Sequence, residues 1–244
     1  MWEMKPVEIL IYPEYKEVVN RRKWTLITGF PGFGYVGTIA TRYIADKLSA
    51  VKVGDVITKY MPDFAALEDY GVMTPYELFV VEDEDLMILI NNSIPQPPER
   101  VAYALRFAEW FSKIGGKAIL AGGLNKKFKV SEEDFRWACI HGCGWFFEGP
   151  QIEKGLYIVG PLAMFFTAFN LRKIPTLLLF PYTDPSKYDP GAAAVFVREV
   201  SKLLGLRISV DDLIQYSKIV AEAEATLEEA LKKSREDKGV KPYM

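Results

Sequence analysis

The chain has 244 residues, of which 50% are hydrophobic and 25% are charged, a composition typical of globular proteins that excludes disordered, collagen-like and low-complexity chains. Thirty Lys and Arg residues against 32 Asp and Glu residues give a formal net charge of -2. Because no long block of one charge occurs, we expect no nucleic-acid partner.

The first half of the chain predicts alternating strands and helices. Short apolar runs at 7–12 and 24–28, bounded by charged or turn residues, predict two strands. A glycine-rich turn follows, and apolar residues from Val36 to Leu48 then recur with the period of one helix face. Two further strands, at 77–81 and 86–90, are predicted to form a hairpin. Helical spacing follows a proline-rich loop, and another buried strand is predicted after Gly115 and Gly116.

The second half continues this alternation. Residues 160–172 predict a mostly buried helix, and residues 176–180 predict a central strand. Asp189 is a predicted N-cap before Pro190, and Gly205 is a predicted left-handed C-cap of the same helix. The order of elements predicts an α/β fold with a mostly parallel or mixed sheet flanked by helices.

The sequence divides into three parts. Residues 1–208 are predicted to form the α/β domain, and residues 209–233 a C-terminal helix. Leu213, Val220 and Leu227 of that helix fall on a narrow heptad seam, which either docks on the domain or pairs with another helix. Residues 234–244 lack periodicity and are predicted to be a mobile tail.

The glycine-rich turn is the strongest candidate motif. Gly32, Gly34 and Gly37 match the GxGxxG pattern of dinucleotide sites, between a strand and a helix as that pattern requires. The expected acidic ribose ligand is missing, because Asp55 lies about twenty residues on but follows the predicted end of its strand. We therefore interpret Gly29 and these three glycines as a structural turn. A nucleotide- or nucleoside-binding α/β enzyme that uses this turn is the alternative.

Other candidate chemistry is sparse. Cys139, His141 and Cys143 supply three soft ligands where a structural zinc site needs four, so we expect no metal and a structural or partly buried cysteine pair of open redox state. The acidic run 82–85 is interpreted as an exposed hairpin turn. Residues 183–189 follow a predicted strand at a position where α/β sheets bind ligands. No base, nucleophile and oxyanion donor occur together, so we expect no catalytic residues and no cofactor.

Targeting signals are also absent from the sequence. The longest apolar run, at 156–169, is broken by Gly160 and Pro161 and is shorter than the ~20 residues of a membrane span. The N-terminus lacks the basic-then-apolar pattern of a signal peptide. We expect no membrane association and a cytoplasmic location, and the scarcity of Gln and Asn alongside many charges favours a thermophilic source.

Several segments together resemble the PAC2 family, the archaeal relatives of proteasome assembly chaperone 2. The resemblance extends over residues 25–215 and is carried by motifs in a fixed order, namely GFPGFGYVG at 29–37, YEL at 76–78, QP at 96–97, IPTLLL at 174–179, YDPGAA at 188–193 and LLGL at 203–206. It implies a fold related to purine nucleoside phosphorylases, no catalytic constellation, and a homo-oligomer that binds proteasome α-subunits or another protein partner.

The resemblance also implies a role for the last three residues. Family members, like proteasome activators, can end in a hydrophobic residue, Tyr and one further residue. Here Pro242 stands at the hydrophobic position, Tyr243 is penultimate, and Met244 supplies the terminal carboxylate. Pockets that read a terminal carboxylate bind such peptides, so Pro242, Tyr243 and Met244 are the candidate partner-binding residues.

Overall fold

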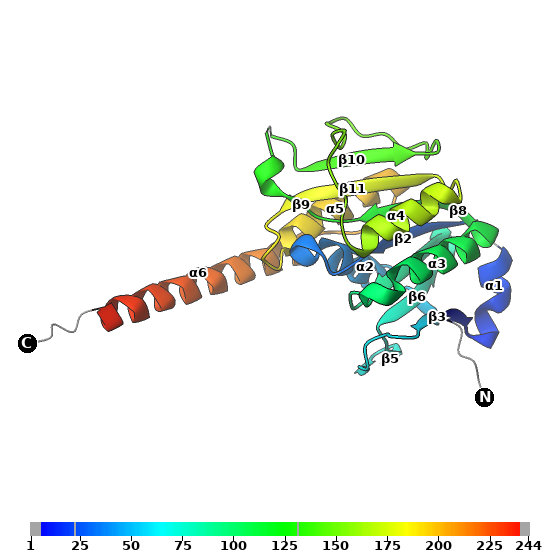
Figure 1. The fold of residues 1–244 in the computed structure, drawn as a ribbon, viewed down its shortest axis with the longest axis horizontal. Coiled ribbons are helices and arrows are strands. Elements are labelled where there is room, and N and C mark those ends of the chain that lie inside the picture. Colours follow the sequence, from blue (N-terminus) through cyan, green and yellow to red (C-terminus); the bar gives the residue numbers. More distant parts are fainter. Residues whose placement is uncertain (1–5, 22, 131, 240–244) are drawn as a thin grey trace, which may run out of the picture.

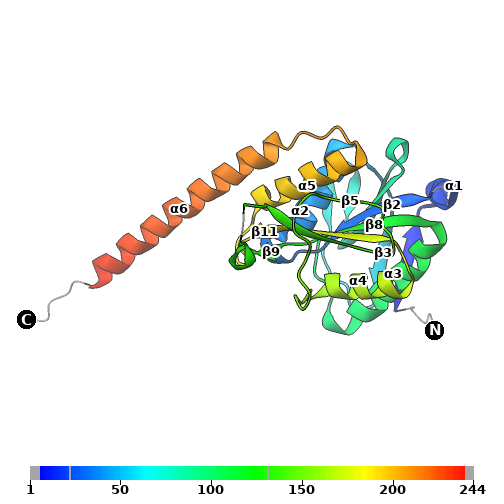
Figure 2. The same ribbon diagram turned by 90° about the horizontal axis from the view of Figure 1, so that it is seen from above.

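The computed structural model describes residues 6–21, 23–130 and 132–239. A nine-stranded mixed sheet lies at its centre, with helices on both faces (Figures 1 and 2). The strand order is β1-β3-β6-β7-β2-β8-β11-β10, and β9 pairs with β11. The predicted α/β fold with a mixed sheet between helices is confirmed.

The strands of this sheet are β1 (Val7–Ile11), β2 (Trp24–Gly29), β3 (Val51–Thr58), β6 (Tyr76–Val81), β7 (Leu86–Asn91), β8 (Gly115–Ala121), β9 (Leu124–Asn125), β10 (Phe135–Ile140) and β11 (Thr176–Thr183). A separate hairpin contains β4 (Ala66–Glu68) and β5 (Gly71–Met73). The helices are α1 (Lys16–Arg21), α2 (Val36–Lys47), α3 (Arg100–Ile114), α4 (Pro161–Leu171), α5 (Pro190–Leu204) and α6 (Asp211–Gly239).

The centre of the sheet is parallel and its flanks are antiparallel. β2 pairs in parallel with β7 on one side and with β8 on the other, and β8 pairs in parallel with β11. β6 and β7 form the predicted hairpin, whose turn is the exposed acidic run 82–85. The chain therefore reaches both neighbours of β2 by crossovers, and the carboxyl ends of β2, β7 and β8 lie at one edge. In open α/β sheets such a switch point is where ligands bind.

Strand residues alternate between two cores, one on each face. Leu26 of β2 packs in the core covered by α3 and α4, whereas its neighbour Ile27 packs in the core covered by α2 and α5. This alternation follows from the two-residue period of a strand. The apolar composition of 160–172 predicts a mostly buried helix, but α4 buries only one face, and Leu171 is exposed.

The helix over residues 190–204 forms as its end signals predict. The Asp189 carboxylate accepts a hydrogen bond from the Ala192 backbone at 2.9 Å, and Gly205 adopts the left-handed conformation at the C-cap. These contacts satisfy backbone groups that a helix end leaves unpaired.

Four strands, β4, β5, β9 and β10, are missing from the sequence-based expectations, and β3 extends past the end predicted for it. β3 contains Lys52, Gly54 and Asp55, and β10 contains Arg136, so neither shows a clean apolar pattern. β11, predicted as a central strand, lies next to the edge strand β10, and the short β9 adds to it. The polar residues of β3 and β10 are buried because distant parts of the chain supply their partners.

The C-terminal helix α6 begins beside the domain and then extends away from it (Figures 1 and 2). It runs from Asp211 to Gly239, so residues 234–239, assigned to the tail from the sequence, continue the helix. Good helix formers such as Arg, Glu and Lys fill this segment, and no proline interrupts it. Pro242, Tyr243 and Met244 lie outside the described residues. Within the described ranges, no helix is long and apolar enough to span a membrane.

Candidate functional site

The glycine turn after β2 brings that strand and α2 into close contact. A Cβ atom added at Gly37 would lie 2.6 Å from the Phe30 backbone nitrogen and 2.8 Å from the Gly29 Cα. A Cβ atom at Gly29 would lie 2.5 Å from the Gly37 Cα and 2.7 Å from the Ala121 carbonyl oxygen. Real side chains do not approach backbone this closely. Gly29 and Gly37 are therefore required by packing between the helix and the sheet.

The middle of the turn is fixed to the start of α5. Gly34 and Tyr35 both have left-handed backbone conformations, with φ of 64° and 55°. The Gly34 carbonyl accepts a hydrogen bond from the Asp189 backbone at 3.0 Å, and the Thr183 hydroxyl donates to the Asp189 carboxylate at 2.7 Å. This is the loop predicted to hold ligands, and Asp189 is used there to cap α5 and to hold Thr183.

Gly32 differs from the other glycines of the motif. A Cβ atom at this position would have only ordinary contact, 3.8 Å from the Phe30 carbonyl oxygen. Gly32 instead lines a cleft of ≈ 610 Å³. The turn thus forms part of a wall and is not fully enclosed by packing.

This cleft lies at the switch point of the sheet. Its walls come from the loops after β2 and β8, from the connection between β7 and α3, and from residues 155–162 before and within α4. The segment 156–159 is apolar and lies between Gly155 and Gly160, which both have positive φ. Tyr157 in that segment is 89% exposed. The cleft is therefore an apolar surface that is open to solvent.

The side chains that line the cleft favour ligand binding over catalysis. Among the described residues that line it, Arg100 is the only charged side chain, and no Asp, Glu, His, Cys, Ser or Lys is present. A general base, a nucleophile and a phosphate-binding cluster are thus missing from this wall, whereas enzyme sites place such groups together. The apolar walls fit an apolar partner, and Arg100 adds one fixed positive charge.

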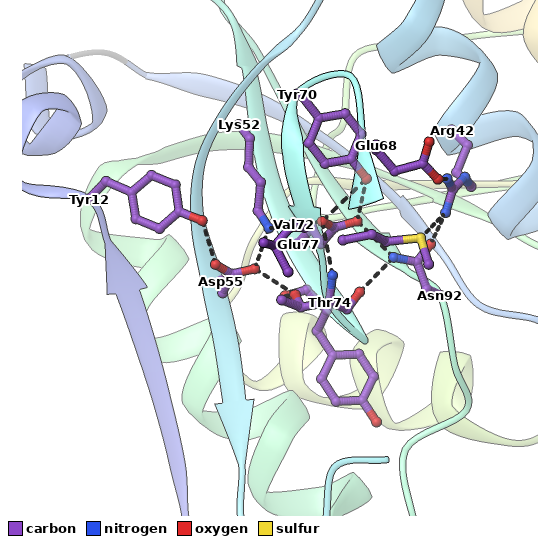
Figure 3. Close-up of polar contacts among 12 residues, drawn as sticks. Tyr12, Arg42, Lys52, Asp55, Glu68, Tyr70, Val72, Thr74, Glu77 and Asn92 are labelled. Carbon is purple, nitrogen blue, oxygen red and sulfur yellow. Dashed lines mark hydrogen bonds and ion pairs between the residues drawn. The ribbon is translucent and has the colours of Figure 1, made fainter. Parts of the chain in front are cut away.

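A second cluster, buried between β3, β6 and the β4–β5 hairpin, holds a lysine between two carboxylates (Figure 3). Lys52 Nζ lies 2.8 Å from Asp55 and 2.9 Å from Glu77, and it donates to the Val72 carbonyl at 2.7 Å. The Lys52 side chain is 6% exposed and that of Glu77 is fully buried. All three ammonium donors therefore have acceptors.

The carboxylates of this cluster are equally well paired. Tyr12 and Thr74 each donate a hydrogen bond of 2.6 Å to Asp55, and Asn92 donates to Glu77 at 2.7 Å. Burial by itself lowers the pKa of Lys52, but hydrogen bonds and attraction from Asp55 and Glu77 outweigh it and raise that pKa above its usual value. The cluster therefore ties the β4–β5 hairpin and Tyr12, which follows β1, to β3 and β6.

Asp55 does not lie where a ribose ligand would, but not because its strand ends before it, as the sequence predicts. Its strand does not end before it, because β3 continues to Thr58. Asp55 is instead held in the Lys52 cluster, and β3 is separated from β2 by β6 and β7. The sequence could not show this, because spacing along the chain does not give the order of strands in the sheet.

The cysteines and the histidine form no metal site. Cys139 and Cys143 form a disulfide, so the two cysteines pair with each other as the sequence suggested. His141 lies 2.9 Å from the Asn170 side-chain oxygen. Among the described residues, no group of three or more His, Cys, Asp or Glu side chains could hold a metal ion.

The family comparison agrees with this geometry. The PAC2 family model matches residues 26–229 of the chain. The chain belongs to the PAC2 family. This match covers the sheet apart from β1 and the first two residues of β2, and it includes the glycine turn and most of α6. A comparison of the sequence with curated proteins finds no match.

Solved structures of similar fold include two from Pyrococcus furiosus. PbaA, an archaeal homolog of proteasome-assembly chaperone, is 21% identical with a TM-score of 0.74, and the match covers 96% of this chain and 97% of PbaA. PbaB, an archaeal proteasome activator, is 20% identical with a TM-score of 0.76, over 92% of this chain and 100% of PbaB. Rv2125, a proteasome-assembly chaperone homologue from Mycobacterium tuberculosis, is 14% identical with a TM-score of 0.61, over 83% of this chain and 94% of that protein. At these identities the comparison establishes the fold of this PAC2 family member.

Proposed function

We propose that this PAC2 family member is a non-enzymatic, chaperone-like protein that binds proteasome α-subunits or a related protein partner as a homo-oligomer. Family membership supports the proposal, as do the printed descriptions of PbaA as a homolog of proteasome-assembly chaperone and of PbaB as a proteasome activator. The cleft at the switch point supports binding over catalysis, because its walls are apolar and, of the residues that the structure describes, Arg100 alone brings a charged side chain to it.

The course of α6 is the observation that carries the binding mode. At 1.5 Å per residue the helix is roughly 43 Å long, and its C-terminal end lies away from the sheet (Figures 1 and 2). The end of α6 at Gly239 therefore lies where another protein can approach it. Tyr243 and the Met244 carboxylate are then the groups that a terminal-carboxylate pocket on an α-subunit would bind. Several copies in one oligomer would strengthen a weak single contact by roughly a hundredfold or more where the spacing fits.

Deletion of Pro242, Tyr243 and Met244 tests this mode. Pull-down of purified proteasome α-subunits with the full chain and with the deletion variant is expected to show at least a roughly tenfold loss for the variant, since terminal-carboxylate capture needs both the ring and the charge. Replacement of Lys241 by Ala is the matched control, because it keeps the last three residues. Unchanged binding after the deletion would contradict the mode, and light scattering on both proteins reports the oligomeric state.

A further inference from the structure

The apolar cleft combines a large hydrophobic surface with one unpaired charge. Its volume of ≈ 610 Å³ falls within the ~300–1,000 Å³ of pockets that bury small ligands and short peptide ends. Phe33, Ile94 and Phe128 at its rim are each about two-fifths exposed, at 40%, 42% and 41%. Contiguous exposed apolar surface of this kind marks a binding site.

Arg100 lies at the cleft and has no acidic partner among the residues of the described ranges. Its Nε donates to the Pro95 carbonyl at 2.8 Å, which fixes the base of the guanidinium. Within the part of the chain that the structure describes, its two terminal nitrogens make no hydrogen bond or ion pair, and no carboxylate lines the cleft. A guanidinium presents paired donors that match a carboxylate. The complementary ligand is therefore apolar and bears one carboxylate.

We propose that this cleft binds the C-terminal Pro242-Tyr243-Met244 segment of a second copy of the chain, with the terminal carboxylate at Arg100 and the side chains against the apolar walls. The segment has the required chemistry, because it contains an aromatic ring, a thioether and a free carboxylate. This site goes beyond the proposed function and does not depend on it.

The last five residues are too short for the tail to reach the cleft of its own chain. Val220 and Ala221 of α6 line a pocket together with the domain. From Ala221 to Gly239 the helix extends about a further 27 Å. Five more residues span at most ~17 Å when fully extended. The tail therefore cannot return along the helix to its own cleft, and a second copy must supply the cleft.

A labelled peptide tests the site directly. The peptide of residues 234–244 is titrated, as the free acid and as the C-terminal amide, into the chain that lacks Pro242 to Met244, so that no other tail competes. We expect the free acid to bind roughly tenfold or more tightly than the amide, as for a hydrogen bond to a charged group. Equal binding of acid and amide would overturn the proposal.

Substitution of Arg100 tests whether the preference for the free-acid peptide over the amide arises in the cleft. Arg100→Gln is expected to abolish the preference for the free acid, and Arg100→Lys to keep part of it. Arg106→Gln is the matched control, because Arg106 lies on α3 and pairs with Glu109 outside the cleft. Retention of the full preference in Arg100→Gln would overturn the proposal. So would a short fatty acid, such as decanoate, that binds more tightly than the peptide and depends on Arg100.

A second pair of variants tests the cleft without changing Arg100, so that the result does not depend on how well the Arg100 variants fold. Tyr157 is 89% exposed, so Tyr157→Ser changes the cleft wall with little effect on the core. We expect it to weaken the peptide severalfold, whereas Tyr60→Ser, on an exposed residue outside the cleft, leaves binding unchanged. Unchanged binding in Tyr157→Ser would count against the site. The peptide titration contains no α-subunit, so failure here is distinguishable from failure of the proposed function, which the α-subunit pull-down tests.

Discussion

Substitution of Gly37 by Ala, compared with the same change at Gly32, tests whether the glycine turn is architecture. The new methyl group at Gly37 would meet the Phe30 nitrogen at 2.6 Å, the Gly29 Cα at 2.8 Å and the Ala121 carbonyl oxygen at 2.9 Å. All three are backbone atoms, so relief requires α2 to move from the sheet. Overpacking of this kind costs roughly 1–3 kcal/mol.

The expected net loss at Gly37 is smaller than the overpacking alone. Ala reduces the conformational entropy of the unfolded chain and favours the helix, which returns about 0.4–1 kcal/mol. A net loss of about 1–2 kcal/mol corresponds to a fall in Tm of roughly 2–8 °C for a domain of this size. Gly32→Ala adds a methyl group with only a 3.8 Å contact, so its effect should stay within about 0.5 kcal/mol.

Thermal and urea unfolding of the two purified variants measure this difference. An architectural turn predicts a destabilised Gly37→Ala protein and a near-native Gly32→Ala protein. A Gly37→Ala protein as stable as the wild type would refute the packing argument. Equal destabilisation by both changes would also refute it, since Gly32 has no close neighbour that an added methyl group would displace.

Two further predictions concern the buried Lys52 cluster. Lys52→Met should lower the free energy of unfolding by about 3–5 kcal/mol in urea titrations, because it leaves the carboxylates of Asp55 and Glu77 without their cation. The control Lys59→Met, at an exposed lysine, should change it by less than about 0.5 kcal/mol. A loss below about 1 kcal/mol for Lys52→Met would contradict the role of the cluster. Burial, and then the charge of Glu77, raise the pKa of Tyr70 from 10.0 to about 12. Its contribution to stability is therefore present below pH 10 and is lost as the pH rises to about 12. Across this pH range the free energy of unfolding should fall less steeply for Tyr70→Phe than for the wild type.

The sequence predicts elements whose signals are local. The α5 helix is an example, since Asp189 and Gly205 act on backbone groups within a few residues of themselves. The full extent of β3 could not be predicted in this way, because Lys52 and Asp55 interrupt its apolar pattern and become compatible with burial only through partners such as Glu77 on another strand. The cleft escaped prediction for the same reason. Its walls come from loops that meet only when the strand order is known.

The glycine turn supports both proposed binding regions. Its first residues, Pro31 to Phe33, line the cleft, and Gly34 accepts a hydrogen bond from Asp189 at the start of α5. The start of α5 in turn lies against α6, because a Cβ atom at Gly191 would be 2.9 Å from the Ser217 hydroxyl. A displaced turn would therefore disturb the cleft and the base of the helix that carries the tail. Arg100 acts on the cleft alone, which is why its substitution, and not that of a turn glycine, separates the two binding regions.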